Sequence, residues 1–192
     1  MSQPDVPAVS AAVPDTTAST APGGEFAKLA AHLKRGSTST GDRAALARLS
    51  PDALQPHELA ALSRALLAAG LAPESWRADT WPRWALIAHG IALAGHDGSR
   101  SLGEQLAHAG VSESRVTKLL TSRGEAFRQG LPRLLRLLAS HGVSPNWREL
   151  GELVLLDSST DRQRVEAAEA LRLRIAGPYF SHKAHQDRKA AA

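Results

Sequence analysis

Several side chains in the sequence could do chemistry if their spacing completed a nucleotide-binding or catalytic motif. Gly36 and Gly41 have the separation of the two glycines in a phosphate-binding P-loop. In that motif a lysine and then a serine or threonine must follow, to hold the phosphates and magnesium. Asp42 and Arg43 stand in those places, and no strand pattern precedes them. We interpret the segment as a linker.

The histidines are candidate metal ligands or acid–base groups. His182 and His185 lie in a polar stretch near the end of the chain, where a solvated tail is the simpler interpretation. His89 and His108 lie in or beside apolar segments, where histidines are more often hydrogen-bonded core residues than catalysts. The chain has no cysteine, and it has no Gly-x-Ser-x-Gly or His-Glu-x-x-His motif. We expect no catalytic residue, no metal site and no cofactor.

The strongest chemical signal is positive charge between residues 115 and 136. Regularly spaced cations suit a long anion such as a nucleic-acid backbone, because neutralised phosphates release condensed counterions. A solvated basic face that keeps the protein soluble is the alternative interpretation. Aromatic residues make up only 4% of the chain, so base-stacking platforms should be scarce and backbone contact is the expected mode. The stretch holds one acid, Glu125, against six basic residues: Arg115, Lys118, Arg123, Arg128, Arg133 and Arg136.

Helices must position these cations, and both composition and spacing predict an all-α fold. Hydrophobic residues make up 43% of the chain. With few aromatics, the core must rest on Leu, Ala, Val and Ile, of which the first two favour helices. Apolar residues recur at helical spacing, and no segment alternates as a strand would. We expect eight or nine helices packed as helical bundles, in a single domain over residues 25–180.

Within the basic stretch, the helical phase keeps the charges away from the core. On the first helix, Val116, Leu119 and Leu120 are expected to face inward. Arg115 and Lys118 are three residues apart and share another face. On the next helix the expected core stripe is Leu131, Leu134, Leu135 and Leu138, and the expected exposed pair is Arg133 and Arg136.

Capping residues, glycines and prolines predict where the helices begin and end. Ser101 and Glu104 form a capping box, and the apolar stretch from Thr80 to Ala94 should be a buried central helix that ends at Gly95. Pro56 should open a helix that Gly70 ends. The other expected helices are one around Phe26–Leu33, one over Asp42–Leu49, one from Ser112 to about Gly124, one on to His141 with a kink or a new start at Pro132, one from Ser144–Pro145 to about Leu155, and one from Thr160 or Asp161 to a point before Gly177–Pro178.

Both ends of the chain are predicted to be tails. Residues 1–24 hold two acids, no Lys or Arg and almost no large apolar side chain, so they should be disordered. Residues 181–192 are polar and should fray. All 23 basic residues follow the first tail, and the whole chain has a net charge of +4. The sequence shows neither a membrane helix nor a signal-peptide pattern, which predicts a cytoplasmic protein.

Short segments in a particular order carry a family resemblance. The central ones are Ser101–Ala107, Val111–Arg115, Leu119–Leu120, Leu131–Leu138, Val143 and Asn146–Trp147. Arg35–Gly36 and Gly41–Arg48 form a basic opening, and Ile175–Phe180 forms an aromatic close. Over roughly residues 26–180, this order resembles the CasB family, the small subunit of the type I-E CRISPR surveillance complex Cascade. The chain departs from the family pattern at Pro56–Leu59, which lacks aromatics, and at Asp157–Thr160, which lacks a tryptophan.

The resemblance implies an all-helical, non-catalytic subunit present in more than one copy in Cascade. Its implied partners are the other protein subunits, further copies of itself, the guide RNA, and target DNA with the displaced strand of the R-loop, but no membrane. Strand cleavage in this system belongs to a separate nuclease. On positions that match the family, the implied phosphate contacts are Arg43, Arg48, Arg83, Arg115, Lys118, Arg133 and Arg136.

Two other functions fit the same residues. A free-standing helical DNA-binding regulator would prefer a duplex sequence and would keep that preference at high salt. A purely structural scaffold subunit would carry the basic faces only as solvated surface. Cascade membership predicts weak, salt-sensitive binding that tolerates any sequence.

Overall fold

The computed structural model describes residues 23–34 and 38–190. The predicted disordered tail over residues 1–24 lies outside them except for Gly23 and Gly24, and Gly36 of the predicted linker also lies outside them. Within the described residues the regular structure is helical and includes no strand, which confirms the all-α prediction.

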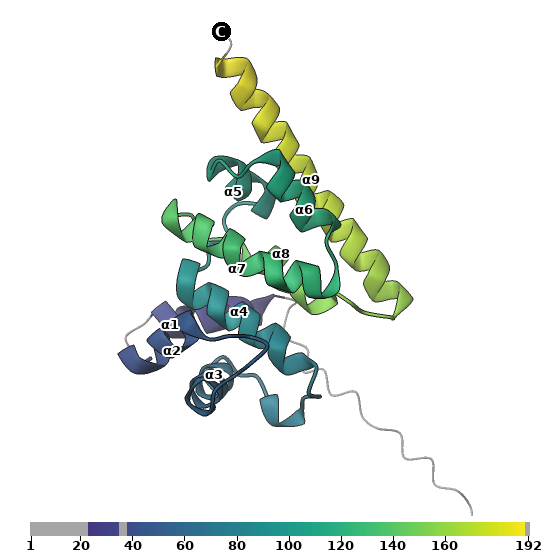
Figure 1. Cartoon of the computed structure of the whole chain (residues 1–192). Helices are drawn as coiled ribbons and strands as arrows, with labels where there is room; N and C mark the ends of the chain where they lie inside the picture. Colours follow the sequence, from purple (N-terminus) through teal and green to yellow (C-terminus); the bar gives the residue numbers. More distant parts are fainter. Residues whose placement is uncertain (1–22, 35–37, 191–192) are drawn as a thin grey trace, which may run out of the picture.

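Nine α-helices and one short 3₁₀-helix follow one another along the described part of the chain, in agreement with the eight or nine helices predicted (Figure 1). In chain order they are α1 (Gly24–Lys34), α2 (Thr40–Arg48), α3 (Pro56–Ala68), η1 (Pro73–Ser75), α4 (Thr80–Ala94), α5 (Leu102–His108), α6 (Glu113–Thr121), α7 (Gly124–Ser140), α8 (Trp147–Leu156) and α9 (Arg162–Ala190).

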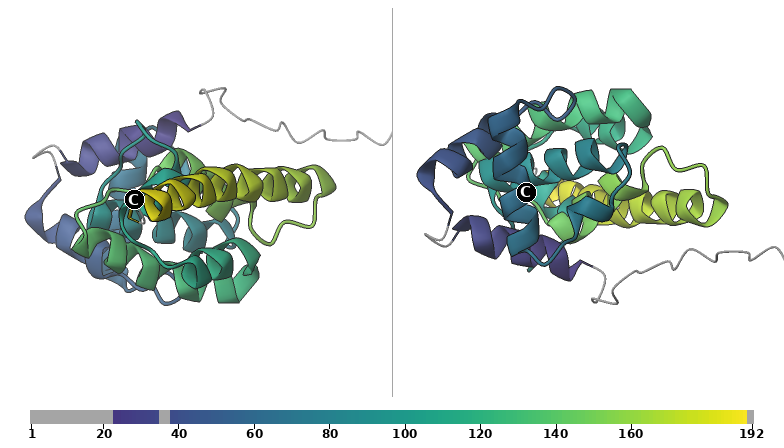
Figure 2. Two further views of the ribbon diagram at one scale, coloured as in Figure 1. Left: turned by 90° about the horizontal axis from the view of Figure 1, so that it is seen from above. Right: turned by 90° about the horizontal axis from the view of Figure 1, so that it is seen from below.

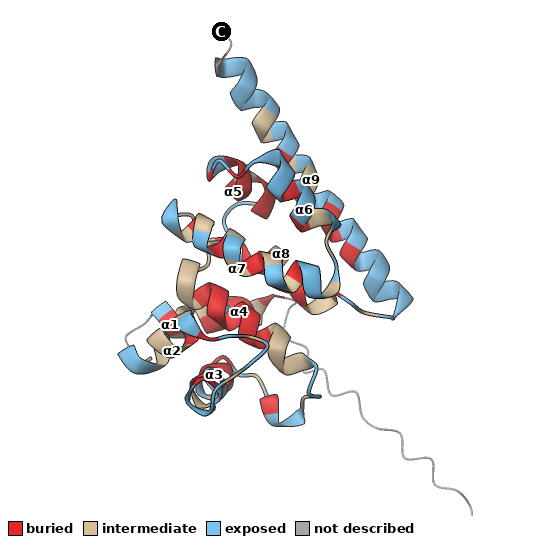
Figure 3. Ribbon diagram, in the orientation of Figure 1, coloured by how far each residue is buried: buried red, intermediate tan, exposed pale blue. Residues whose placement is uncertain are grey.

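The central helix of the core is α4. Its residues from Trp84 to Ile91 are all buried, and it contacts α1, α2, α7 and α8 (Figures 1 and 3). The helix begins and ends where the apolar run predicted. It stops at Gly95, which has a φ of 75° that L side chains rarely adopt. This buried helix is the support against which the N-terminal helices and α7 are placed.

The end of the last helix was predicted wrongly. The sequence placed it before Gly177–Pro178, with frayed chain over residues 181–192, but α9 continues through the proline to Ala190. A proline inside a helix removes one backbone hydrogen bond and costs roughly 3 kcal/mol. Ile175 and Tyr179 flank the proline and are both fully buried, and this packing offsets the loss. The C-terminal part of α9 projects beyond the other helices (Figure 1).

Local signals predicted several other boundaries correctly. The capping box at the start of α5 is present, because the Ser101 hydroxyl accepts the Glu104 N–H and the Glu104 carboxylate accepts the Ser101 N–H. The helix α3 begins at Pro56 and ends before Gly70, whose φ is 82°. These signals act between residues close in sequence, so a single sequence reveals them.

The start of α8 differs from the prediction, and at Pro132 the structure excludes one of the two predicted alternatives. The start of α8 is capped by Asn146, whose side-chain oxygen accepts the Arg148 N–H at 3.0 Å, so the helix begins after the predicted Ser144–Pro145. Pro132 does not start a new helix, and α7 is continuous across it. Buried leucines on both sides of Pro132 hold α7 against α4.

The prediction of hydrogen-bonded core histidines is confirmed for His89 and wrong for His108. His89 of α4 is 4% exposed, and its Nδ1 lies 3.1 Å from the Leu46 carbonyl oxygen of α2. Burial lowers the pKa of His89; the bond to Leu46 opposes this shift, and the positive charge of Arg136 adds to it. His108, in contrast, is exposed at the end of α5.

We expect the free energy of unfolding to decrease as the pH falls below about 6.5, the ordinary pKa of histidine. The unfolded chain protonates His89 near that pH, whereas the folded protein does so only at a lower pH, so acid favours unfolding. The stability that neutral His89 contributes is fully present above about pH 6.5. It is lost as the pH falls toward the lowered pKa of His89 in the folded protein. Urea unfolding at pH 7.5 and 5.5 should show a weaker pH dependence for His89→Asn than for wild type. The exposed control His108→Asn should match wild type, and equal pH dependence in all three proteins would contradict this account.

Candidate nucleic-acid interface

Helices α6 and α7 present the basic stretch in the phase that the sequence predicted. On α6, Val116 and Leu119 are buried, whereas Arg115 and Lys118 are exposed. Packing of the buried stripes against the core therefore fixes the direction in which the cations point. On α7 the buried leucines are Leu131, Leu135 and Leu138, and the exposed arginines are Arg133 and Arg136.

A groove of about 460 Å³ lies between α6 and α7. Three of the predicted phosphate contacts line it: Arg115, Lys118 and Arg133. We call these three the rim cations. No Asp or Glu of the described residues lines the groove. Its floor is apolar and consists of Leu119, Phe127, Leu131, Leu134 and Leu137.

The rim cations are free to meet an outside anion. None of them forms an ion pair with any residue in the described ranges. Some other arginines of the described residues are held by carboxylates. Arg123, from the same basic stretch, donates to both carboxylate oxygens of Glu169 at 2.8 and 3.0 Å. Of the six basic residues between positions 115 and 136, Arg123 is therefore the one whose charge an acid of the described residues neutralises.

Asp157 holds the first residue of α7. Its Oδ2 accepts the Gly124 N–H at 2.9 Å and the Ser158 hydroxyl at 3.0 Å. Its Oδ1 lies 3.4 Å from Nη2 of Arg172 in α9, and both side chains are almost fully buried. A carboxylate at a helix N-terminus satisfies a free N–H and complements the helix dipole. The Asp157–Thr160 segment, where the sequence departs from the family pattern, thus joins α7, α8 and α9.

Two more of the predicted contacts lie near a different part of α7. The charge of Arg136 acts on His89 of α4, which is bonded to the Leu46 carbonyl of α2. Arg48 follows two residues later, at the end of α2. Both arginines are exposed, and neither pairs with an acid in the described part of the chain. Arg136 and the end of α2 therefore flank the same buried histidine.

The remaining two predicted contacts have separate surroundings. Arg43 lines a hollow beside α1 and α4, together with Lys34. Arg83 is half-buried, and its Nη1 donates to the Leu155 carbonyl at 3.0 Å. Arg164 donates to the same carbonyl. Leu155 lies in the last turn of α8, where free carbonyls favour cations, so Arg83 supports a helix end.

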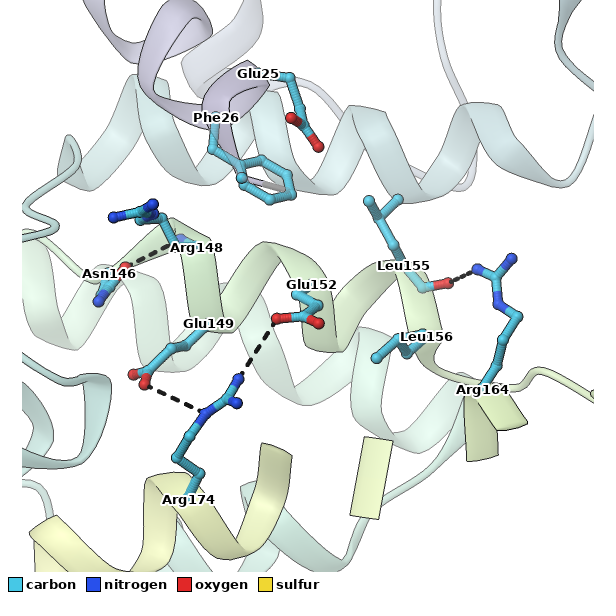
Figure 4. Close-up of a pocket in the computed structure, with 11 residues that line it drawn as sticks. Glu25, Phe26, Asn146, Arg148, Glu149, Glu152, Leu155, Leu156, Arg164 and Arg174 are labelled. Carbon is cyan, nitrogen blue, oxygen red and sulfur yellow. Dashed lines mark hydrogen bonds and ion pairs between the residues drawn. The ribbon is translucent and has the colours of Figure 1, made fainter. Parts of the chain in front are cut away.

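A further hollow of about 490 Å³ lies where α1, α8 and α9 meet (Figure 4). One of its three arginines faces carboxylates: Arg174 of α9 reaches Glu149 at 4.0 Å and Glu152 at 3.6 Å on α8. In Figure 2, α1 lies at one edge of the molecule and the α6–α7 pair at the opposite edge, so this hollow is distinct from the groove. Its internal ion pairs suit it poorly to binding an anion.

The sequence predicted the cations but missed the shape of the groove. Leu134 was expected in the core, yet it is half-buried and lines the groove. Ala126 and Gly130 also line it, and a Cβ built on Gly130 meets no atom within 4 Å. Ala126, Gly130 and Leu134 follow at intervals of four residues, so they share one face of α7. The two small residues Ala126 and Gly130, beside the leucine stripe of α7, are the signal that could have revealed the groove.

The described residues offer little for other kinds of site. They contain no group of three or more His, Cys, Asp or Glu side chains that could hold a metal ion. His182 and His185 lie on α9. None of the helices in the described ranges is long and apolar enough to cross a membrane.

Comparison with known proteins places the chain in one family. The family model described as CRISPR-associated protein Cse2 matches residues 30–180, which include α2 to α8 and all seven predicted contacts. Searches of curated proteins and of solved structures gave no match. Cse2 is the same family as CasB, so the match confirms the resemblance found in the sequence. The chain belongs to the Cse2 (CasB) family, the small subunit of the type I-E CRISPR complex Cascade.

Proposed function

We propose that the groove between α6 and α7 binds a nucleic-acid backbone and thereby stabilises the R-loop formed by Cascade. The observation that carries this proposal is the set of rim cations, Arg115, Lys118 and Arg133. They line one groove without any acid, and no described residue pairs with them. Cations in such an arrangement neutralise phosphates and release counterions without reading sequence.

The displaced strand of target DNA is the partner that this surface suits best. R-loop formation is a near-balanced exchange of a DNA duplex for an RNA–DNA hybrid, so a modest contact with the displaced strand can tip it. In our proposal the path of the strand continues over Arg136 toward Arg48, and Arg43 is a separate contact with guide RNA or target DNA. The subunit acts in the cytoplasm, beside further copies of itself, and does no chemistry.

Replacing the rim cations with glutamine (Arg115→Gln, Lys118→Gln and Arg133→Gln together) is expected to weaken R-loop formation by reconstituted Cascade. Loss of three phosphate contacts should reduce the slope of log affinity for the displaced strand against log salt by about 2. The assay measures R-loop yield on supercoiled target DNA at several salt concentrations. The three side chains are exposed, so the helical circular dichroism signal and subunit assembly should not change.

A matched control removes the same charge elsewhere. Arg64→Gln, Arg162→Gln and Lys183→Gln change cations that already pair with carboxylates. This control should keep the salt slope and R-loop yield of wild type. Equal losses in both triple variants would mean that only net charge matters. Preference for one duplex sequence at high salt would favour a free-standing regulator instead.

A purely structural scaffold is the second candidate, and the outer face of α9 favours it. Leu173 is 75% exposed and Phe180 is 41% exposed, and with Gly177 they follow the spacing of one helix face. Exposed apolar residues grouped in this way are typical of protein contacts. Figure 3 shows that α9 is exposed along most of its C-terminal part. Unchanged R-loop yield without the rim cations would favour this role.

A further inference from the structure

The floor of the α6–α7 groove is more apolar than phosphate binding requires. Leu119, Phe127 and Leu131 close the groove from below, and Leu134 and Leu137 are half-buried along it. A surface that bound only phosphates would need cations but no apolar side chains between them. The apolar floor between the rim cations therefore indicates a ligand that has an apolar face as well as negative charge.

Gly130 keeps the middle of the groove open. At Gly90, Gly103 and Gly151, an added Cβ would lie 2.3, 2.2 and 2.7 Å from a neighbouring atom, so close packing explains those glycines. At Gly130 nothing lies within 4 Å. Glycine is also a poor residue for the middle of a helix. Packing therefore does not account for Gly130, and its missing side chain leaves the middle of the groove open.

A nucleotide of a single strand has the two chemical parts that the groove would complement. Its phosphates are anionic, as the rim cations require, and its base is flat and largely apolar, as the floor requires. The volume of about 460 Å³ falls in the range of about 300–1,000 Å³ that is usual for ligand sites. In a duplex the bases are stacked inside and out of reach, so the base must be unstacked.

We propose that the groove receives an unstacked base above Gly130 while Arg115, Lys118 and Arg133 hold the neighbouring phosphates. This inference rests on the proposed function and narrows its ligand to single-stranded nucleic acid. Apart from the rim cations, Ser122 is the polar side chain among the described lining residues. With so few groups able to read a base edge, the site should accept any base.

Two substitutions at one position test the proposal. Gly130→Leu fills the open space with a good helix former, whereas Gly130→Ala adds a single methyl group. The probes are a fluorescent single-stranded oligodeoxynucleotide and an abasic strand of the same length, and binding to the full-length chain is measured by anisotropy. Wild type should bind the strand with bases about tenfold more tightly than the abasic strand. Gly130→Leu should lose most of this difference, and Gly130→Ala should keep it.

The results distinguish this inference from the proposed function. The rim-cation variant should bind both strands more weakly and to a similar extent. If it does so while Gly130→Leu binds as wild type does, the base site is wrong and backbone binding stands. If the rim-cation variant binds both strands as wild type does, the proposed function itself fails.

Two further results would overturn the base site. One is equal affinity of wild type for the strand with bases and for the abasic strand, or for a duplex of the same length. The other is a Gly130→Leu protein that binds both strands normally but assembles poorly with Cascade subunits. That result would mean that the groove holds a protein segment and not a base.

Discussion

Replacing Asp157 with alanine is expected to lower the free energy of unfolding by about 3–5 kcal/mol. The carboxylate is 4% exposed and accepts hydrogen bonds from Gly124 and Ser158 while facing Arg172. Without it, the charge of Arg172 stays buried, and among the described residues Glu169 is its remaining ion-pair partner, at 3.2 Å. Burial already lowers the pKa of Arg172, which shows that its charged form is poorly solvated there.

Urea unfolding followed by circular dichroism measures this loss, and an exposed ion pair supplies the control. Arg64→Ala breaks the pair with Asp42, in which the Arg64 side chain is 59% exposed. Exposed pairs contribute about 0–1 kcal/mol, so this control should stay within that range. Asp157→Asn should fall between the two, because it keeps a hydrogen-bond acceptor for Gly124 but loses the charge. A loss for Asp157→Ala no larger than for Arg64→Ala would contradict the structural role of Asp157.

The same contact couples stability to the proposed site. Asp157 holds the N-terminus of α7, and the groove begins within the first turn of that helix, at Ala126 and Phe127. A frayed first turn would move the floor of the groove relative to Arg115 and Lys118 on α6. The Asp157→Ala protein should therefore also bind single strands more weakly, although Asp157 touches no ligand in our proposal.

The sequence predicted those features that depend on residues close together in the chain. The limits of α4 follow from one apolar run and Gly95, and the directions of Arg115 and Arg133 follow from helical phase. The role of Asp157 could not be predicted, because Gly124 and Arg172 lie 33 and 15 residues away in the chain. The polar run around Asp157 has the composition of an ordinary loop.

The end of α9 and the shape of the groove show the same limit. Pro178 is a strong local signal for a helix end, but the burial of Tyr179 against distant residues outweighs it, with the Tyr179 hydroxyl donating to the Val111 carbonyl at 2.7 Å. The groove needs α6 and α7 side by side, which helical phase alone does not specify. The sequence therefore showed which cations are exposed, and the fold determined which of them share a groove.

Gly103→Ala is expected to lower the free energy of unfolding by about 2–3 kcal/mol, in the range found for overpacked cores. Gly103 of α5 lies against α9, where an added Cβ would be 2.2 Å from the Ile175 carbonyl oxygen and 2.8 Å from the Tyr179 nitrogen. Both are backbone atoms, which cannot rotate away as a side chain would. The two helices must therefore separate, and the fully buried side chains of Ile175 and Tyr179 lose contacts.

The same substitution at Gly130 provides the control, because there only helix propensity changes. Gly130→Ala should raise the free energy of unfolding by about 0.5–1 kcal/mol, since alanine is the better helix former and nothing lies near the new methyl group. Urea unfolding of the two variants should thus give shifts of opposite sign from wild type. A gain in stability for both would mean that α5 and α9 are not closely packed at Gly103. A loss for both would mean that the space above Gly130 is filled, and the open groove on which single-strand binding depends would then not exist.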